Sequence, residues 1–145
     1  TDAAWGTLFN DTLYEASDLQ AQFQINNNQI TPQAGAHDLP NGDLEIIYDL
    51  SESGHKTIRF TNDTIEVTVQ HTDTFTEIIP LLKNTSDTLE TNNNQLTLKR
   101  NDVTLTIESS NPITTHSTEH TSGNHAVVTA HIKAENSLTY RLNFA

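Results

Sequence analysis

The chain has 145 residues, and 19 acidic against 7 basic side chains give it a formal net charge of −12 at pH 7 with histidine counted as neutral. This balance argues against nucleic-acid binding, which needs a cationic surface to neutralise phosphates, and against adsorption to an anionic membrane. Cysteine is absent, so disulfides, thiol chemistry and cysteine-ligated zinc are excluded. No apolar run reaches the roughly 18 residues that insertion into a membrane requires.

The N-terminal part of the chain gives weak secondary-structure signals. In 11–20, the apolar residues Leu13, Ala16 and Leu19 are spaced three apart, which fits either one short helix or a strand with an irregular edge. Over the whole chain, 23 threonines and 15 asparagines favour strands and turns, respectively. We therefore expect an all-β protein.

From residue 43 onward, alternation of apolar and polar side chains is the dominant pattern. In 64–71, Ile65, Val67 and Val69 fall on one face, and the residues between them are polar. This period of two predicts strands with one buried and one hydrated face. The same pattern predicts strands at 43–50, 56–61, 95–99, 102–108, 126–134 and 137–144.

Turn-forming residues separate these strands at regular intervals. Asn62-Asp63 is a candidate two-residue hairpin turn, and Arg100-Asn101 and Glu135-Asn136 hold equivalent positions further on. The polar stretch 109–125 is predicted to be the longest loop. Together these signals predict a single domain over 1–145, an antiparallel β-sandwich of about ten strands with a jelly-roll or super-sandwich arrangement.

The composition also favours a compartment. Low lysine, high acid content, abundant threonine and asparagine and the absence of cysteine are typical of an exported bacterial domain. Methionine is absent, including at position 1, so we expect a mature fragment, a cleaved product or a domain excised from a larger protein. We therefore expect an extracytoplasmic location, either secreted or periplasmic.

One region has a familiar order of elements. An acidic-fronted strand at 43–50, a hairpin, a second strand and the segment FTEIIPLL at 75–82 precede a closing hairpin at 126–144. Over about residues 40–145 this order resembles the C-terminal β-sandwich of polysaccharide lyases of the heparinase II/III-like kind, where it follows an α-helical toroid. In that family the catalytic Tyr and His come largely from the helical part and the first strands of the sheet. The resemblance therefore implies an accessory or structural domain, and no family motif places a catalytic residue on this chain.

The densest group of potential metal ligands is His116, Glu119, His120 and His125. Three imidazoles and a carboxylate suit Zn²⁺, Cu²⁺ or Ni²⁺ if the backbone brings about four donors together. The alternative is a polar loop whose imidazoles titrate near neutral pH without binding a metal.

A second group is rich in oxygen and consists of Asp38, Asn41 and Asp43, with Asp49 on the following strand. Ca²⁺ takes about six to eight oxygen ligands, so this corner is a candidate calcium site, although its spacing does not match an EF-hand. The alternative is a turn in which Asp and Asn simply favour the backbone geometry. Of the two ions, the sequence favours Ca²⁺ over Zn²⁺.

Glycan contacts would use aromatic rings and cations. Trp5, the sole tryptophan, is either a stacking platform for a sugar ring or a packing anchor at the end of the sandwich. Four cations would form an outward row if their strands were neighbours: Lys99, Arg100, Lys133 and Arg141. Such a row suits the carboxylates or sulfates of an acidic polysaccharide, and the alternative is a solvated face without a partner.

The leading hypothesis is a non-catalytic accessory β-sandwich domain of an extracellular carbohydrate-active enzyme similar to the polysaccharide lyases. Its partners would be the catalytic domain of the same protein and an anionic polysaccharide. No Ser-His-Asp spacing or glycine-rich phosphate loop indicates catalysis by this chain alone. The first alternative is an extracellular adhesion or surface module stabilised by Ca²⁺, and the second is a small metal-dependent enzyme that uses 116–125.

Overall fold

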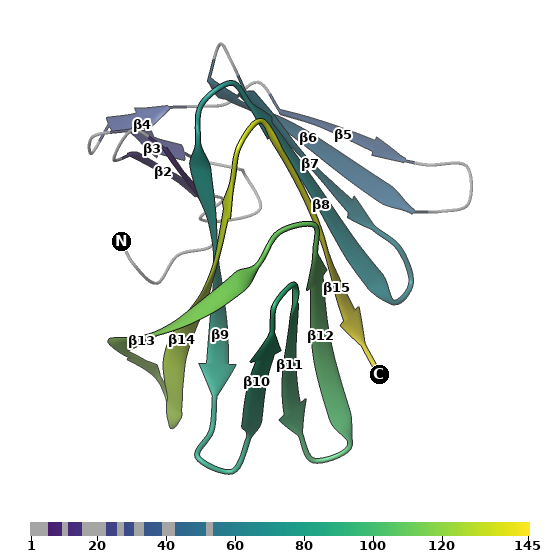
Figure 1. Ribbon diagram of the computed structural model, residues 1–145. Helices are drawn as coiled ribbons and strands as arrows, with labels where there is room; N and C mark the ends of the chain where they lie inside the picture. The colour runs from purple at the N-terminus through teal and green to yellow at the C-terminus, as the bar shows by residue number, and fades with distance from the viewer. Residues whose placement is uncertain are drawn as a thin grey trace.

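The computed structural model describes residues 6–9, 12–15, 23–25, 28–30, 34–38, 43–51 and 54–145, with side chains for 43–47, 54–121 and 123–145. All regular structure in these ranges is β-strand (Figure 1). The strands are β1 (Gly6–Phe9), β2 (Thr12–Glu15), β3 (Phe23–Ile25), β4 (Asn28–Ile30), β5 (Ala34–Asp38), β6 (Leu44–Ser51), β7 (Gly54–Phe60), β8 (Thr64–His71), β9 (Phe75–Lys83), β10 (Thr88–Asn92), β11 (Gln95–Arg100), β12 (Val103–Ser109), β13 (Ile113–Ser122), β14 (His125–Ala134) and β15 (Ser137–Phe144). The described ranges thus hold fifteen strands, more than the predicted number, because five short strands precede residue 43.

The strands form two main sheets. Every pair of neighbouring strands within a sheet is antiparallel, which confirms the predicted all-β antiparallel class. The large sheet has the order β10-β11-β12-β15-β8-β7-β6-β5, the small sheet has the order β13-β14-β9-β1-β2, and β3 and β4 form a separate ribbon. One buried cluster draws residues from both sheets, including Val67 and Leu138 from the large sheet and Ile79 and Ile132 from the small one. The alternating apolar faces of the two sheets therefore share a single core.

Two chain segments cross between the sheets side by side (Figure 1). β8 and β15 pair in the large sheet, whereas the strands that adjoin them in the chain, β9 and β14, pair in the small sheet. The backbone N–H of His71 donates to the carbonyl oxygen of Asn136 at 2.8 Å and ties the two crossings together. The expectation of a closing hairpin at 126–144 was therefore wrong: Glu135-Asn136 is a corner between sheets.

The predicted loop at 109–125 is largely a strand. Ile113–Ser122 forms β13, which pairs with β14 and has a register shift between Ser117 and Thr121. β13 is an edge strand, so it needs only one neighbour for its hydrogen bonds, and its sequence can stay polar except at the buried Ile113. Hydrophobic alternation, the signal on which strand prediction depends, is absent from such a segment.

Three further expectations concern two hairpin turns and the segment 11–20. The Asn62-Asp63 hairpin is confirmed, since Thr61 N–H donates to the carbonyl of Thr64 at 2.9 Å across it. The next predicted turn is displaced by one residue, because Arg100 pairs with Val103 and the turn residues are Asn101-Asp102. Within 11–20, the described residues Thr12–Glu15 form a strand rather than a helix.

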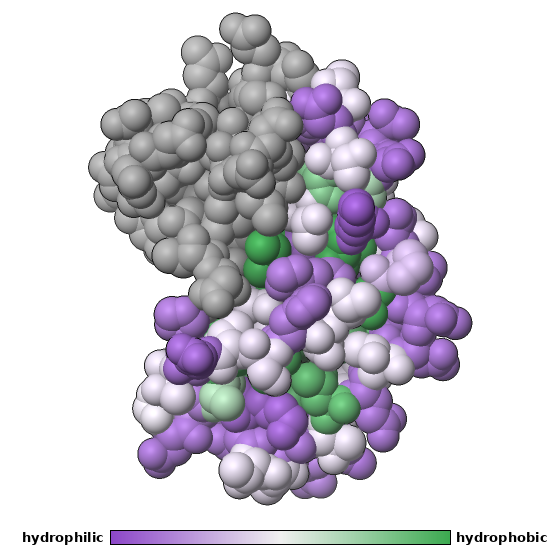
Figure 2. All heavy atoms as spheres, turned by 60° about the vertical axis from the view of Figure 1, so that its left-hand side comes forward, coloured by the Kyte–Doolittle hydropathy of each residue, from purple (hydrophilic) through white to green (hydrophobic). Residues whose placement is uncertain are grey.

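One face of the described residues is largely polar (Figure 2). Figure 2 shows one face on which hydrophilic and intermediate residues predominate and hydrophobic residues appear in small separate patches. Threonine recurs on the outer face of the large sheet, at positions such as Thr57, Thr68 and Thr139. Nothing in the described ranges is a helix that could span a bilayer.

Candidate functional site

The outer face of the large sheet carries a row of alternating charge. Five in-register positions on consecutive strands β6, β7, β8, β15 and β12 hold acidic and basic residues in turn: Glu45, Arg59, Glu66, Arg141 and Glu108. The neighbouring rows hold hydroxyl and amide side chains, such as Thr57, Thr68 and Thr139 on one side. Opposite charges on adjacent strands stabilise a sheet modestly, so the row has a structural role as well as any binding role.

Two arginines of this row line a cleft of about 280 Å³ together with Thr61, Thr64 and Glu66. Arg141 Nη2 donates to Glu66 Oε2 at 2.9 Å, and both side chains are partly exposed. Arg59, on the other side of Glu66, has no hydrogen-bond or ion-pair partner among the described residues. The cleft therefore has two guanidinium groups for one carboxylate, and one guanidinium has free donors.

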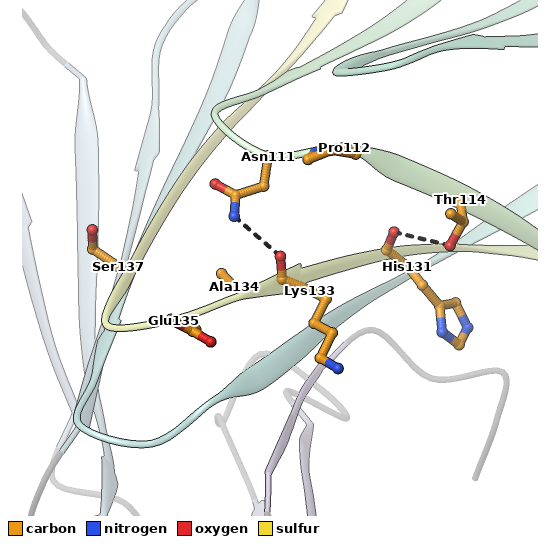
Figure 3. A pocket seen from close by; sticks show the side chains of 8 residues that line it. All are labelled: Asn111, Pro112, Thr114, His131, Lys133, Ala134, Glu135 and Ser137. Atoms are coloured by element: carbon orange, nitrogen blue, oxygen red, sulfur yellow. Dashed lines mark hydrogen bonds between the residues drawn. The ribbon is translucent and has the colours of Figure 1, made fainter.

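A second pocket, of about 580 Å³, lies where β13 and the β14–β15 corner approach each other (Figure 3). The amide of Asn111 donates to the Lys133 carbonyl at 3.1 Å and holds the two segments together. The polar side chains around the pocket are those of Asn111, Thr114, His131, Lys133, Glu135 and Ser137. Because its ammonium has no partner among the described residues, Lys133 is a second candidate contact for an anion.

The imidazole of His131 lines this pocket, and its surroundings lower its pKa. Burial lowers the pKa of its imidazole, and the neighbouring His116 lowers that pKa further. The ring centroids of His131 and His116 are 4.2 Å apart, with a 46° angle between the ring planes. This pKa shift favours the uncharged form of the His131 ring over the cation at neutral pH.

The four cations of the predicted outward row do not lie in one row. Lys99 and Arg141 point outward from the large sheet, but β12 separates their strands, and Lys133 belongs to the small sheet. Arg100 binds within the protein: its Nε and Nη2 donate to the Asp87 carboxylate at 2.6–3.1 Å, and Nη2 also donates to the Leu82 carbonyl at 2.8 Å. Lys99 is exposed and has no partner among the described residues.

The predicted metal ligands are dispersed. His116 lies opposite Thr129, His125 lies opposite Ser122, and His120 falls within the register shift of β13. Among the described residues, no group of three histidine, aspartate or glutamate side chains is arranged to hold a metal. Binding of zinc by the predicted set stays a prediction without geometric support.

The predicted calcium corner is described only in part. Asp38 ends β5 opposite Leu44, and Asp43 directly precedes β6, whereas Asn41 lies outside the described residues. Trp5, the candidate stacking platform, also lies outside them. Calcium binding and the role of Trp5 therefore stay predictions.

Sequence reasoning missed Arg59 and gave no role to Asp87. Arg59 alternates with apolar residues within 56–61, so the sequence could have predicted that it points outward. Its alignment with Arg141 could not be predicted, because it depends on two strand pairings. Asp87 is buried in a turn, where Asn84 N–H donates to Oδ2 at 2.8 Å, and Arg100 is its cation. No local pattern connects residues 87 and 100.

The apolar end of the molecule is a third surface feature. Leu82, Val103 and Phe144 are exposed around a groove of about 610 Å³ whose walls also include Leu98 and Leu142. Aliphatic walls of this kind offer few donors to a polar glycan.

Comparisons with known proteins identify the fold but no family. No family model matches the chain, and no curated protein matches it. Among solved structures, the heparan sulfate lyase HepC from Pedobacter heparinus is similar to it, with a TM-score of 0.59 and 11% sequence identity. The match covers 99% of this chain and 24% of that one, so this chain spans about a quarter of the lyase's length. At this identity, the likeness shows a shared β fold related to that of a polysaccharide lyase.

Proposed function

We propose that this chain is a non-catalytic accessory β domain of a larger polysaccharide-processing enzyme, and that it contacts the carboxylate or sulfate groups of an acidic polysaccharide. The observation that carries the glycan contact is the unpartnered Arg59 guanidinium in a cleft with Arg141. The β fold shared with a heparan sulfate lyase supports the choice of glycan class, because heparan sulfate is a sulfated polysaccharide. With this role we expect an extracytoplasmic location.

The charge of the protein restricts how such a glycan can approach. A formal net charge of −12 repels a polyanion at long range, so binding has to come from short-range contacts. Guanidinium groups supply these contacts, because their planar donors match carboxylate and sulfate oxygens bidentately. The hydroxyls of Thr61 and Thr64 in the same cleft donate within the protein, to the Thr64 carbonyl and to Asn143 Oδ1, and their oxygens can still accept hydrogen bonds from sugar hydroxyls.

Titration calorimetry with heparan sulfate tests this proposal, with uncharged dextran as the matched neutral glycan. We expect binding of heparan sulfate alone, a loss of roughly tenfold in affinity for Arg59→Gln, and no change for Lys99→Gln, since a charged hydrogen bond contributes about 1.5–3 kcal/mol. Lys99→Gln is the control because it removes an exposed cation from the same sheet face outside the cleft. Equal losses in the two variants, or no binding of the sulfated glycan, would contradict the proposal.

A further inference from the structure

His116 and His131 form a compact pair on the outer face of the small sheet. In the register of β13 and β14, His116 lies opposite Thr129 and His131 lies opposite Thr114. The two imidazoles therefore occupy one diagonal of a four-residue rectangle, and the two threonine hydroxyls occupy the other. The rings lean along their strands toward one another, which brings their centroids to 4.2 Å.

The hydroxyls orient the rings. The Nε2 atom of His116 lies 3.3 Å from Thr114 Oγ1, and the Nε2 atom of His131 lies 3.0 Å from Thr129 Oγ1. Each ring thus has a neutral hydrogen-bonding neighbour, and no third histidine, aspartate or glutamate of the described residues completes a metal-binding group with the pair. A positive charge on His116 would disfavour a proton on His131, since like charges repel.

We propose that His116 and His131 are a two-imidazole site for a divalent transition-metal ion, and that Cu²⁺ binds there most tightly. Imidazole is a preferred ligand of Cu²⁺, Ni²⁺ and Zn²⁺, and affinity for nitrogen sites in this series is greatest for Cu²⁺. Nitrogens bound at right angles to one ion at about 2.0–2.1 Å lie roughly 3 Å apart, and the two ring centroids here are 4.2 Å apart. Binding therefore requires both side chains to rotate away from their threonine neighbours until a nitrogen of each ring faces the same ion.

The surroundings favour metal binding at neutral pH. Metal ligation requires an unprotonated imidazole, and burial together with His116 lowers the pKa of His131. Water would fill the remaining coordination positions, because His116 and Thr114 are exposed. The site differs from the set predicted from sequence, since His131 takes the place of Glu119, His120 and His125. It does not depend on the glycan contact.

Electron paramagnetic resonance of the full chain with one equivalent of CuCl₂ at pH 7.5 tests the site, because nitrogen modulation counts the coordinated imidazoles. We expect one Cu²⁺ with two imidazoles in the native chain. His131→Gln and His116→Gln should each leave one imidazole and weaken Cu²⁺ binding by roughly tenfold or more, since losing even an outer-sphere partner costs about that much. His125→Gln, on the same hairpin but away from the pair, should leave the signal unchanged.

Thermal unfolding provides a second readout and a check on folding. Cu²⁺ should raise the melting temperature of the native chain and of His125→Gln by mass action, and raise it less for His131→Gln. Equal melting temperatures of the three proteins in chelator would show that the substitutions leave the fold intact. A two-imidazole signal that persists in His131→Gln, or a native chain that binds no stoichiometric Cu²⁺, would overturn the proposal.

Discussion

Lys56 and Glu77 form a buried ion pair that joins the two sheets: Lys56 Nζ on β7 lies 2.8 Å from Glu77 Oε2 on β9. Tyr140 of β15 donates its hydroxyl to the same carboxylate oxygen. No buried side-chain nitrogen or oxygen in the described residues lacks a hydrogen-bond partner, so this polar group is accommodated within an otherwise apolar core. Its cost in desolvation is offset by specific contacts that hold one sheet at a fixed position on the other.

Lys56→Met should destabilise the fold by about 3–5 kcal/mol, because it leaves the buried Glu77 carboxylate without its cation. Urea unfolding followed by circular dichroism measures this loss. Arg141→Met is the matched control, since it breaks a partly exposed pair with Glu66 that contributes about 1 kcal/mol or less. Similar losses for the two variants would show that the buried pair contributes no more to stability than the partly exposed one.

The pair between Asp87 and Arg100 should make stability depend on acidic pH. Hydrogen bonds from Arg100 and from the Asn84 backbone lower the pKa of Asp87 from 3.8 to about 2. Between these values the unfolded chain binds more protons than the folded one, so the stabilisation is complete above pH 3.8 and is lost as pH falls toward 2.

Asp87→Asn removes that contribution. We expect the variant to be less stable than the native chain at pH 7, and the difference in free energy of unfolding to narrow as the pH falls from 3.8 toward 2. Denaturant titrations at several pH values measure the difference. A gap that stays constant over that range would contradict the role of the Asp87 carboxylate.

Gly54 should not tolerate a side chain. A Cβ there would lie 2.2 Å from His71 Cδ2 and 3.1 Å from the Gln70 carbonyl oxygen. His71 cannot move away freely, because it is buried and its Nδ1 accepts a hydrogen bond from Asp73 N–H at 2.9 Å. Gly54→Ala should therefore cost about 1–3 kcal/mol through overpacking, as measured by urea unfolding.

Gly123→Ala is the comparison for this effect. A Cβ at Gly123 would meet no other atom within 4 Å, but the φ of +61° disfavours a side chain there through backbone strain alone. Replacing His71 by alanine should reduce the cost of Gly54→Ala and leave the cost of Gly123→Ala unchanged. A Gly54→Ala penalty that is independent of His71 would exclude the clash as its cause.

The corner residue Asn136 has a left-handed backbone, with a φ of 67°. Asn136→Gly should retain native stability, whereas Asn136→Val should lose roughly 1–2 kcal/mol, because β-branched residues are disfavoured in this conformation. The melting temperature measures both. Ser137→Val, at an exposed strand position one residue later, is the control and should have little effect; an equal loss there would point to hydrophobic exposure instead.

Strands β7, β8, β11 and β15 of the large sheet were predictable because each buries one face. In β8, Val67 and Val69 are fully buried and the residues that flank them are more exposed, so the alternation in the sequence is the alternation in the structure. Alternation did not predict β13, because Ile113 is the apolar residue that this strand buries in the core. Sheet membership could not be predicted either, because a two-residue turn and a crossing between sheets need similar residues.

The candidate sites were harder to predict than the strands. His131 approaches His116, and Arg59 approaches Arg141, only through the register of paired strands. A search among neighbours in the sequence therefore grouped His116 with His120 and His125, which lie apart in the structure. Side chains that meet across strands are set by tertiary pairing, for which a single sequence contains little local signal.

β15 is placed between β12 and β8, although it follows both of them in the chain (Figure 1). Without β15, β5–β8 and β10–β12 would not be paired with one another, and the edges of β8 and β12 that β15 covers would be open. Closing the gap requires contacts between residues far apart in sequence, and such contacts slow folding because chain entropy is lost before they form. During that interval the edges of β8 and β12 can accept a strand from another molecule, so the yield of refolding should fall as protein concentration rises.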